Sequence, residues 1–192
     1  QAQTFERLVL GQLYETTGVR ENQDILDHYI SVIEGKTGSL IAAAGEYGSL
    51  LAGASEEVIQ MLATYGELVG VAFQLADDVI DIVSDGASSG KTQGTDLREG
   101  VPTLPTILLN RAAEAGDESA RQVQTLIEAD LSSDDALAAA VSALAAHPVT
   151  QEAWQIAYDW ADRAIAAIAP LPDSTAKAAL ESFAHAVVHR EG

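Results

Sequence analysis

The sequence predicts an all-α protein, an antiparallel helical bundle, from three observations. Alanine is frequent, aromatic residues make up only 5% of the chain, and alternating runs of β-branched residues are scarce. Alanine is the strongest helix former, whereas half-buried strands alternate apolar and polar residues with a period of two. Apolar residues recur instead at helical spacing along most of the chain, so we expect helices and no sheet.

The first two helices are bounded by turn residues. The first is predicted from residue 2 to Thr17, where Gly18 ends it, and Asn22 is placed to cap the second. Residues 25–33 carry apolar side chains at helical spacing. Gly35 then interrupts the second helix, because glycine is a weak helix former.

Two more helices follow before the chain becomes irregular. A helix from residue 39 to about residue 51 carries Gly45 and Gly48, small residues that permit close helix packing. Ser55 caps the longest helix, which extends for about thirty residues by its periodicity and ends near Val83. Residues 84–100, rich in Ser, Gly and Asp, are predicted to be a long irregular segment. Such segments are usually functional or disordered.

The remaining part is predicted to be a plain bundle. Pro102 and Pro105 fit the first turn of the next helix. Four further helices are expected near residues 117–129, 133–146, 151–168 and 173–189, separated at residues 132–133, at Pro148 and at residues 170–172. No internal repeat and no domain linker is visible.

Composition and charge exclude several functions. Ten Lys and Arg against 29 Asp and Glu give a net charge of −19. Nucleic acids and anionic membranes attract basic surfaces, so neither is expected as a partner. The absence of cysteine excludes disulfides and thiolate metal sites, and fits a cytoplasmic location. No apolar run approaches the ~20 residues that cross a bilayer, so no membrane span is expected.

Three aspartates form the strongest candidate site. Asp77, Asp78 and Asp81 lie three and four residues apart, which places their carboxylates on adjacent turns of one helix face, one turn after Gln74. A solvated polar face is the alternative interpretation. Apolar neighbours and like charges make the cluster costly unless a cation bridges it, and Mg²⁺ is the natural bridge between oxygen ligands.

The segment after the aspartates indicates what the metal would bind. It contains Gly90-Lys91 and then Gly94-Thr95-Asp96. Acids beside a glycine-rich segment with a lysine suit an anionic ligand, with the metal between acids and ligand. Diphosphate is the obvious candidate.

Several short motifs stand in a recognisable order. They are Gly11-Gln12 with Glu15, Tyr29, Lys36-Thr37, Phe73 through Asp81, Gly90-Lys91, Gly94 through Leu97, and Thr103 through Pro105. This order resembles that of the trans-isoprenyl diphosphate synthases, the polyprenyl synthetase family. The resemblance covers about residues 1–110 by motif and the rest by helical pattern. It implies a fold of the isoprenoid synthase type.

The resemblance implies a prenyltransferase that joins an allylic diphosphate to isopentenyl diphosphate. Ionisation of the allylic C–O bond would be assisted by Mg²⁺. Asp77 is implied as a direct metal ligand, Asp78 and Asp81 as ligands through water, and Asp96 as a partner of metal-bound water. The family is usually homodimeric, so a homodimer is implied.

The same resemblance assigns substrate roles. Lys36 and Lys91 would hold the allylic diphosphate, while Thr37 and Gln74 would turn oxygen dipoles toward the developing cation. The other implied cavity residues are Phe73 beside the isopentenyl site, with Gln12 and Glu15 from the first helix. Phe73 could instead be an ordinary core residue, and the last two could be surface residues.

The chain also departs from the family pattern. The first aspartate-rich motif and the upstream basic residues of the family are lacking: Asp134-Asp135 is followed by alanine and leucine, not by a third aspartate. Val101 stands where many members have lysine. Apolar residues at helical spacing are already present in the first turns after Gln1. We therefore expect residues 1–192 to be the C-terminal portion of a single polyprenyl synthetase domain. This portion is expected to be inactive alone. The alternatives are a natural short subunit that modulates a partner synthase, or an acidic helical interaction module without chemistry.

Overall fold

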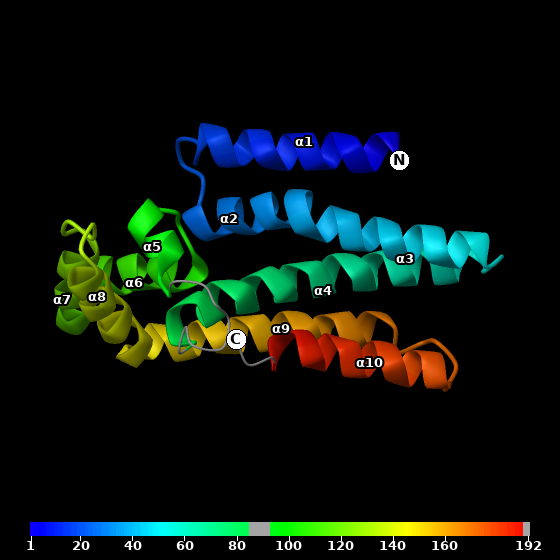
Figure 1. Ribbon diagram of the computed structural model, residues 1–192. Helices are drawn as coiled ribbons and strands as arrows, with labels where there is room; N and C mark the ends of the chain where they lie inside the picture. The colour runs from blue at the N-terminus through cyan, green and yellow to red at the C-terminus, as the bar shows by residue number, and fades with distance from the viewer. Residues whose placement is uncertain (85–92, 190–192) are drawn as a thin grey trace. The chain divides into compact units, whose positions relative to one another are not determined.

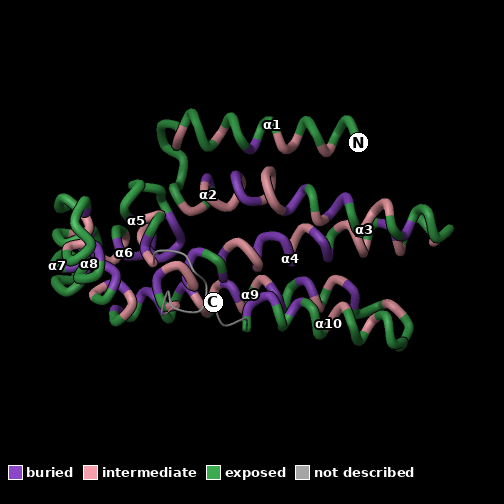
Figure 2. The backbone as a smooth tube through the Cα atoms, viewed as in Figure 1, coloured by how far each residue is buried: buried purple, intermediate pink, exposed green. Residues whose placement is uncertain are grey.

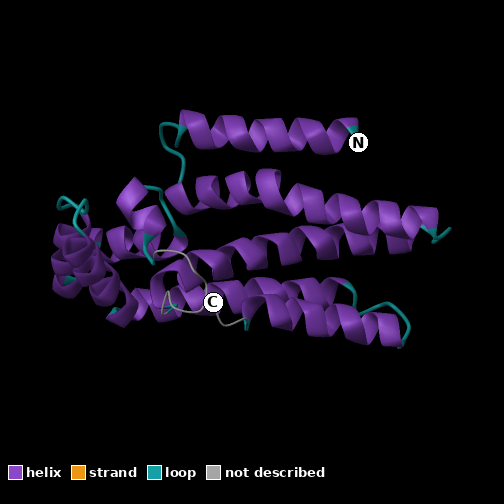
Figure 3. Cartoon of the chain, in the orientation of Figure 1, coloured by secondary structure: helices purple, strands orange, loops and turns teal. Residues whose placement is uncertain are grey.

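The computed structural model describes residues 1–84 and 93–189. Within these residues every regular element is a helix and no strand occurs, which confirms the all-α prediction (Figure 1 and Figure 3). The first helix, α1 (Ala2–Thr17), ends where predicted. Gly18 follows it with a φ of +71°, a conformation that glycine adopts without strain.

The second helix differs from prediction at both ends. Its N-cap is Asp24, whose side chain accepts hydrogen bonds from the Leu26 and Asp27 amides, whereas Asn22 takes a φ of +65° in the turn before it. Gly35 does not end it: α2 (Ile25–Ile33) continues through the π-helical turn η1 (Glu34–Gly38) into α3 (Ser39–Leu51). The Asn22 cap is therefore wrong, and the predicted interruption at Gly35 is a change from α-helical to π-helical hydrogen bonding and not a break in the chain's helical path.

The longest helix, α4 (Glu56–Val83), has the predicted bounds, and the Ser55 hydroxyl accepts from the Val58 amide at 3.4 Å. Val69, Val71 and Leu75 are fully buried, and Figure 2 shows buried residues recurring along much of α4. By length and composition alone, α4 is also the one helix among the described residues that could cross a membrane, but core helices of soluble proteins pass the same test.

The segment predicted to be irregular contains a short helix, α5 (Thr95–Glu99). The next helix, α6 (Leu104–Glu114), starts after Thr103 and has a proline, Pro105, in its first turn as expected, whereas Pro102 lies before the helix. The last four helices are α7 (Glu118–Ile127), α8 (Asp134–Ala146), α9 (Pro148–Ala167) and α10 (Thr175–Val188). Pro148 is thus the first residue of α9 and not a separator, because proline needs no amide hydrogen at that position.

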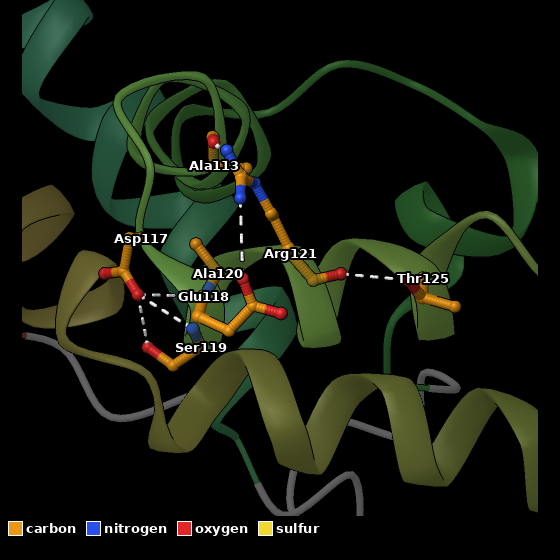
Figure 4. Close-up of polar contacts among 7 residues, drawn as sticks. All are labelled: Ala113, Asp117, Glu118, Ser119, Ala120, Arg121 and Thr125. Atoms are coloured by element: carbon orange, nitrogen blue, oxygen red, sulfur yellow. Dashed lines mark hydrogen bonds and ion pairs between the residues drawn. The ribbon is translucent and has the colours of Figure 1, made fainter.

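Acidic residues outside the candidate site act in part as helix caps. In Figure 4 the Asp117 carboxylate accepts from the Ser119 amide at 2.9 Å and from the Ser119 hydroxyl at 2.7 Å, while Arg121 donates to the Ala113 carbonyl. The hydrogen bonds that Asp117 accepts lower the pKa of its carboxyl, with the Ser119 hydroxyl as the largest cause. Asp117 begins α7 as Asp24 begins α2, so part of the acidic excess caps the N-termini of helices.

The chain divides into two compact units. The first comprises Gln1–Gln74 with Ala157–His189, and the second comprises Leu75–Ile156 among the described residues. The borders fall inside α4 and α9, each of which is a single helix. The assignment of the whole chain to one domain stays a prediction.

Glycines set the packing of the first unit. A Cβ on Gly35 would lie 2.8 Å from the Gly11 Cα, and a Cβ on Gly66 would lie 2.5 Å from the Ile41 carbonyl oxygen. A Cβ on Gly45 would lie similarly close to the Leu62 carbonyl oxygen, whereas a Cβ on Gly48 would meet no other part of the described chain within 4 Å. Backbones therefore approach closely where α1 meets η1 and where α3 meets α4. Of the two glycines predicted to permit close packing in α3, only Gly45 does so.

In the same unit, α10 lies beside the second half of α9 (Figure 1). It is tied to α4 by the Tyr65 hydroxyl, which donates to the Leu180 carbonyl at 2.7 Å. Burial raises the pKa of Tyr65 to about 12, so this phenol keeps its proton and its hydrogen bond far above neutral pH.

Candidate active site

The first group of predicted site residues gathers around Lys36. The Lys36 ammonium donates to both oxygens of Glu15, at 2.8 and 2.7 Å, and the Gln12 amide donates to Glu15 at 2.8 Å. The side chains of Lys36 and Glu15 are 33% and 43% exposed. An ion pair this exposed contributes only about 0.2–1 kcal/mol. A stronger anion can therefore displace Glu15 from Lys36 at low cost.

Close backbone packing brings these three residues together. With no Cβ on Gly11 or Gly35, α1 lies directly against η1. Arg7 also pairs with Glu67 through two hydrogen bonds of 3.0 and 2.8 Å, which ties α1 to α4. The sequence contains both glycines, but it does not reveal that they face each other.

The second group lies on the π turn. The Thr37 hydroxyl donates to the Gln74 side-chain oxygen at 3.4 Å, which joins η1 to α4. Within η1 the chain makes a wider turn than an α-helix, since the Ser39 amide reaches back five residues to the Glu34 carbonyl. Single π turns inside α-helices are frequent at functional sites. Lys36 and Thr37 stand on such a turn, a signal that periodicity alone did not reveal.

Phe73 and Gln74 are half-buried on α4. Phe73 is therefore not a fully buried core residue, and its ring retains surface that a ligand can contact. Its assignment to the isopentenyl site stays a prediction.

In the second unit, the first two aspartates of the cluster have different surroundings. Asp77 is exposed, whereas Asp78 is buried, with 6% exposure. Asp78 accepts a hydrogen bond from the Leu104 amide at 3.0 Å. Leu104 is the first residue of α6, so Asp78 satisfies an amide that has no partner within its own helix. Sequence reasoning missed this structural contact, and metal binding by Asp78 through water stays a prediction.

The carboxylate of Asp81 accepts hydrogen bonds but also has a buried oxygen without a described donor. The backbone amides of Thr95 and Asp96 donate to its carboxylate, while Oδ2 is buried and has no hydrogen-bond partner within residues 1–84 and 93–189. Burial raises the pKa of Asp81, and the neighbouring Asp96 and Asp77 charges raise it further. A buried oxygen without a donor, close to two other carboxylates, is an electrostatically strained arrangement that a cation would relieve.

The fourth predicted ligand, Asp96, lies half-buried on α5. The Gly94 amide donates to the Asp81 carbonyl at 3.0 Å, and Arg98 pairs with Asp134 on α8. Contacts at both ends thus hold α5 in place. Val101 is exposed, with its amide bonded to the Asp96 carbonyl. Lys91, a predicted diphosphate ligand, lies outside the described residues.

The residues present fit a hard divalent cation only in part. In residues 1–84 and 93–189, no three His, Cys, Asp or Glu side chains form a group able to hold a metal by themselves. Asp77 and Asp96 nevertheless lie close enough to Asp81 to raise the pKa of its carboxyl, whose Oδ2 accepts no hydrogen bond from the described residues. Mg²⁺ usually keeps several waters and takes one or two carboxylates together with substrate phosphates. The arrangement suits that mode of binding, and not an all-protein metal cage.

Comparison with known proteins agrees with the motif order. A sequence model of the polyprenyl synthetase family matches residues 1–144. The nonaprenyl diphosphate synthase of Mycobacterium tuberculosis is 41% identical over 191 residues, covering 100% of this chain and 56% of that protein. The octaprenyl diphosphate synthase of Escherichia coli is 36% identical, covering 94% of this chain and 55% of that protein. The chain therefore spans about half the length of these relatives.

Solved structures agree as well. The geranylgeranyl pyrophosphate synthase from Corynebacterium glutamicum, crystallised with calcium and isoprenyl diphosphate, superimposes with a TM-score of 0.87 at 39% identity, over 100% of this chain and 58% of that chain. A polyprenyl synthase from Caulobacter crescentus, also with calcium and isoprenyl diphosphate, gives 0.85 at 30% identity, over 100% and 58%. The chain has the all-α isoprenoid synthase fold and belongs to the polyprenyl synthetase family.

Proposed function

We propose that the protein containing this chain is a trans-prenyltransferase that condenses an allylic diphosphate with isopentenyl diphosphate to give a longer polyprenyl diphosphate. The observation that carries the proposal is Asp81, whose buried Oδ2 has no hydrogen-bond partner among the described residues and whose carboxyl lies close to Asp77 and Asp96. Membership of the polyprenyl synthetase family supports the same reaction class.

Asp77 and Asp81 are the proposed holders of Mg²⁺. The buried Asp78 would contribute through a water molecule, and Asp96 would bond to metal-bound water. When bound, Mg²⁺ supplies positive charge that stabilises the departing diphosphate. The carboxylates orient that charge, and the amides of α5 hold Asp81 in the required position.

Lys36 is proposed to bind the allylic diphosphate in exchange for Glu15, with Lys91 as a second cationic contact. Thr37 and Gln74 direct oxygen dipoles at the carbon from which the diphosphate leaves, where positive charge develops. Phe73, Gln12 and Glu15 are proposed to line the cavity for the hydrocarbon and for isopentenyl diphosphate. Cytoplasmic location and homodimer formation are parts of the same proposal.

The 192-residue chain alone should not complete prenyl transfer, because it lacks the family's first aspartate-rich motif and upstream bases. The measurement is incorporation of labelled isopentenyl diphosphate with an allylic diphosphate and Mg²⁺. The whole protein serves as the positive control. Steady turnover by the isolated chain would contradict this prediction.

Thermal unfolding separates the proposed enzyme from the alternative of an acidic interaction module. Mg²⁺ and inorganic diphosphate together should raise the melting temperature of the whole protein, because a ligand bound only by the folded state stabilises it. Diphosphate with a chelator is the control and should give a smaller shift. An unchanged melting temperature with both ligands would favour the interaction module or a non-catalytic short subunit.

A further inference from the structure

A pair of histidines at the end of α10 lies outside the candidate site. His185 and His189 are one helical turn apart, and their ring centroids are separated by 6.2 Å. Both residues are exposed, in contrast to the buried His28 and His147. His189 is the C-cap of α10, and its amide donates to the His185 carbonyl, so the two residues are one turn apart at the helix end and both imidazoles can reach one bound ion.

Hydrogen bonding fixes which nitrogen of His189 is available. Its Nδ1 lies 2.8 Å from the His185 carbonyl oxygen. A carbonyl oxygen only accepts, so Nδ1 carries a proton, and in the neutral imidazole Nε2 then has the lone pair. Histidines that bind metals usually donate their other ring N–H in this way, most often to a carboxylate or a backbone carbonyl.

Stacking also holds the His189 ring in place. The Tyr158 ring of α9 lies 5.0 Å from it at an interplanar angle of 30°. Among the described residues no hydrogen bond to the His185 ring occurs. Because the His185 side chain is exposed, it can turn toward the Nε2 atom of His189. One fixed ligand and one adjustable ligand therefore stand one turn apart at the end of α10.

We propose that His185 and His189 form a binding site for a divalent transition-metal ion that prefers imidazole, with Zn²⁺ as the probe. No third His, Cys, Asp or Glu joins them within residues 1–84 and 93–189, so water completes the coordination. Imidazole nitrogen favours Zn²⁺, Ni²⁺ and Cu²⁺ over Mg²⁺. This site uses none of the residues proposed for prenyl transfer.

Calorimetric titration of the whole protein with Zn²⁺, in excess Mg²⁺ and at mildly alkaline pH, tests the proposal. We expect one Zn²⁺ per chain at this site, with affinity reduced at least about tenfold in His185→Ala and in His189→Ala, since even loss of an outer-shell partner costs that much. His185→Ala removes an exposed side chain, so it keeps the test valid if His189→Ala destabilises the helix end.

Glu181→Gln is the matched control. Glu181 lies one turn before His185, so it forms the alternative ligand pair on the same helix. Binding should be unchanged in this variant. Equal Zn²⁺ affinity in the wild type and His185→Ala would overturn the proposal, as would a loss in Glu181→Gln as large as that in His189→Ala.

Discussion

Replacing Asp77 by alanine in the whole protein should lower turnover by about 10²–10³-fold, the loss typical when a preorganised electrostatic group is removed from an active site. Asp77 is exposed, and it lies close enough to Asp81 to raise the pKa of that carboxyl. Its removal should therefore weaken Mg²⁺ and diphosphate binding without opening a cavity. The measurement is steady-state incorporation of isopentenyl diphosphate at saturating Mg²⁺.

Asp135→Ala is the matched control for this substitution. Asp134 and Asp135 form another adjacent acidic pair, in the first turn of α8, and Asp135 is exposed. Its loss changes the net charge by the same amount as the loss of Asp77, so turnover should stay near the wild-type value. Near-normal turnover in Asp77→Ala, with an unchanged unfolding curve, would refute the assignment of the aspartate cluster.

Gly45→Ala should destabilise the protein by about 1–3 kcal/mol, the usual cost of forcing an extra methyl group into a packed interface. The new Cβ would collide with the Leu62 carbonyl oxygen and would lie 3.0 Å from the Leu62 carbonyl carbon. Both are backbone atoms, so relief requires α3 and α4 to move apart. The free energy of unfolding from urea titration measures the effect.

Gly48→Ala on the same helix is the control. No described residue outside the surrounding helical turns lies within 4 Å of its Cβ position, so the substitution should stabilise the protein by about 0.5–1 kcal/mol through helix propensity alone. Destabilisation of equal size at both positions would mean that close packing of α3 on α4 does not explain the glycine at position 45.

Most helices could be predicted because apolar periodicity and caps are local properties. Ser55, Gly18 and the bounds of α4 follow from a few neighbouring residues. The errors arise where tertiary contacts decide. A five-residue helix such as α5 has little stability by itself, and it forms where Asp81 accepts its first amides and Arg98 ties it to Asp134.

The chemistry of the candidate site was more predictable than its contacts. Residue types and spacing identify the aspartates and the Lys36-Thr37 pair. They do not reveal that Asp78 is buried against the first amide of α6, or that Glu15 binds Lys36. Partners 26 and 21 residues away in sequence are brought close only by the fold.

The π turn at η1 makes this part of the chain sensitive to length as well as to residue type. A turn closed by a bond over five residues holds one residue more than an α-helical turn. Deleting one residue there would restore a regular helix, but it would rotate α2 by about 100° relative to α3. The buried face of α2, with His28, Val32 and Ile33, would then point away from its neighbours. Insertions and deletions should therefore be excluded from residues 34–38, even where individual substitutions are tolerated.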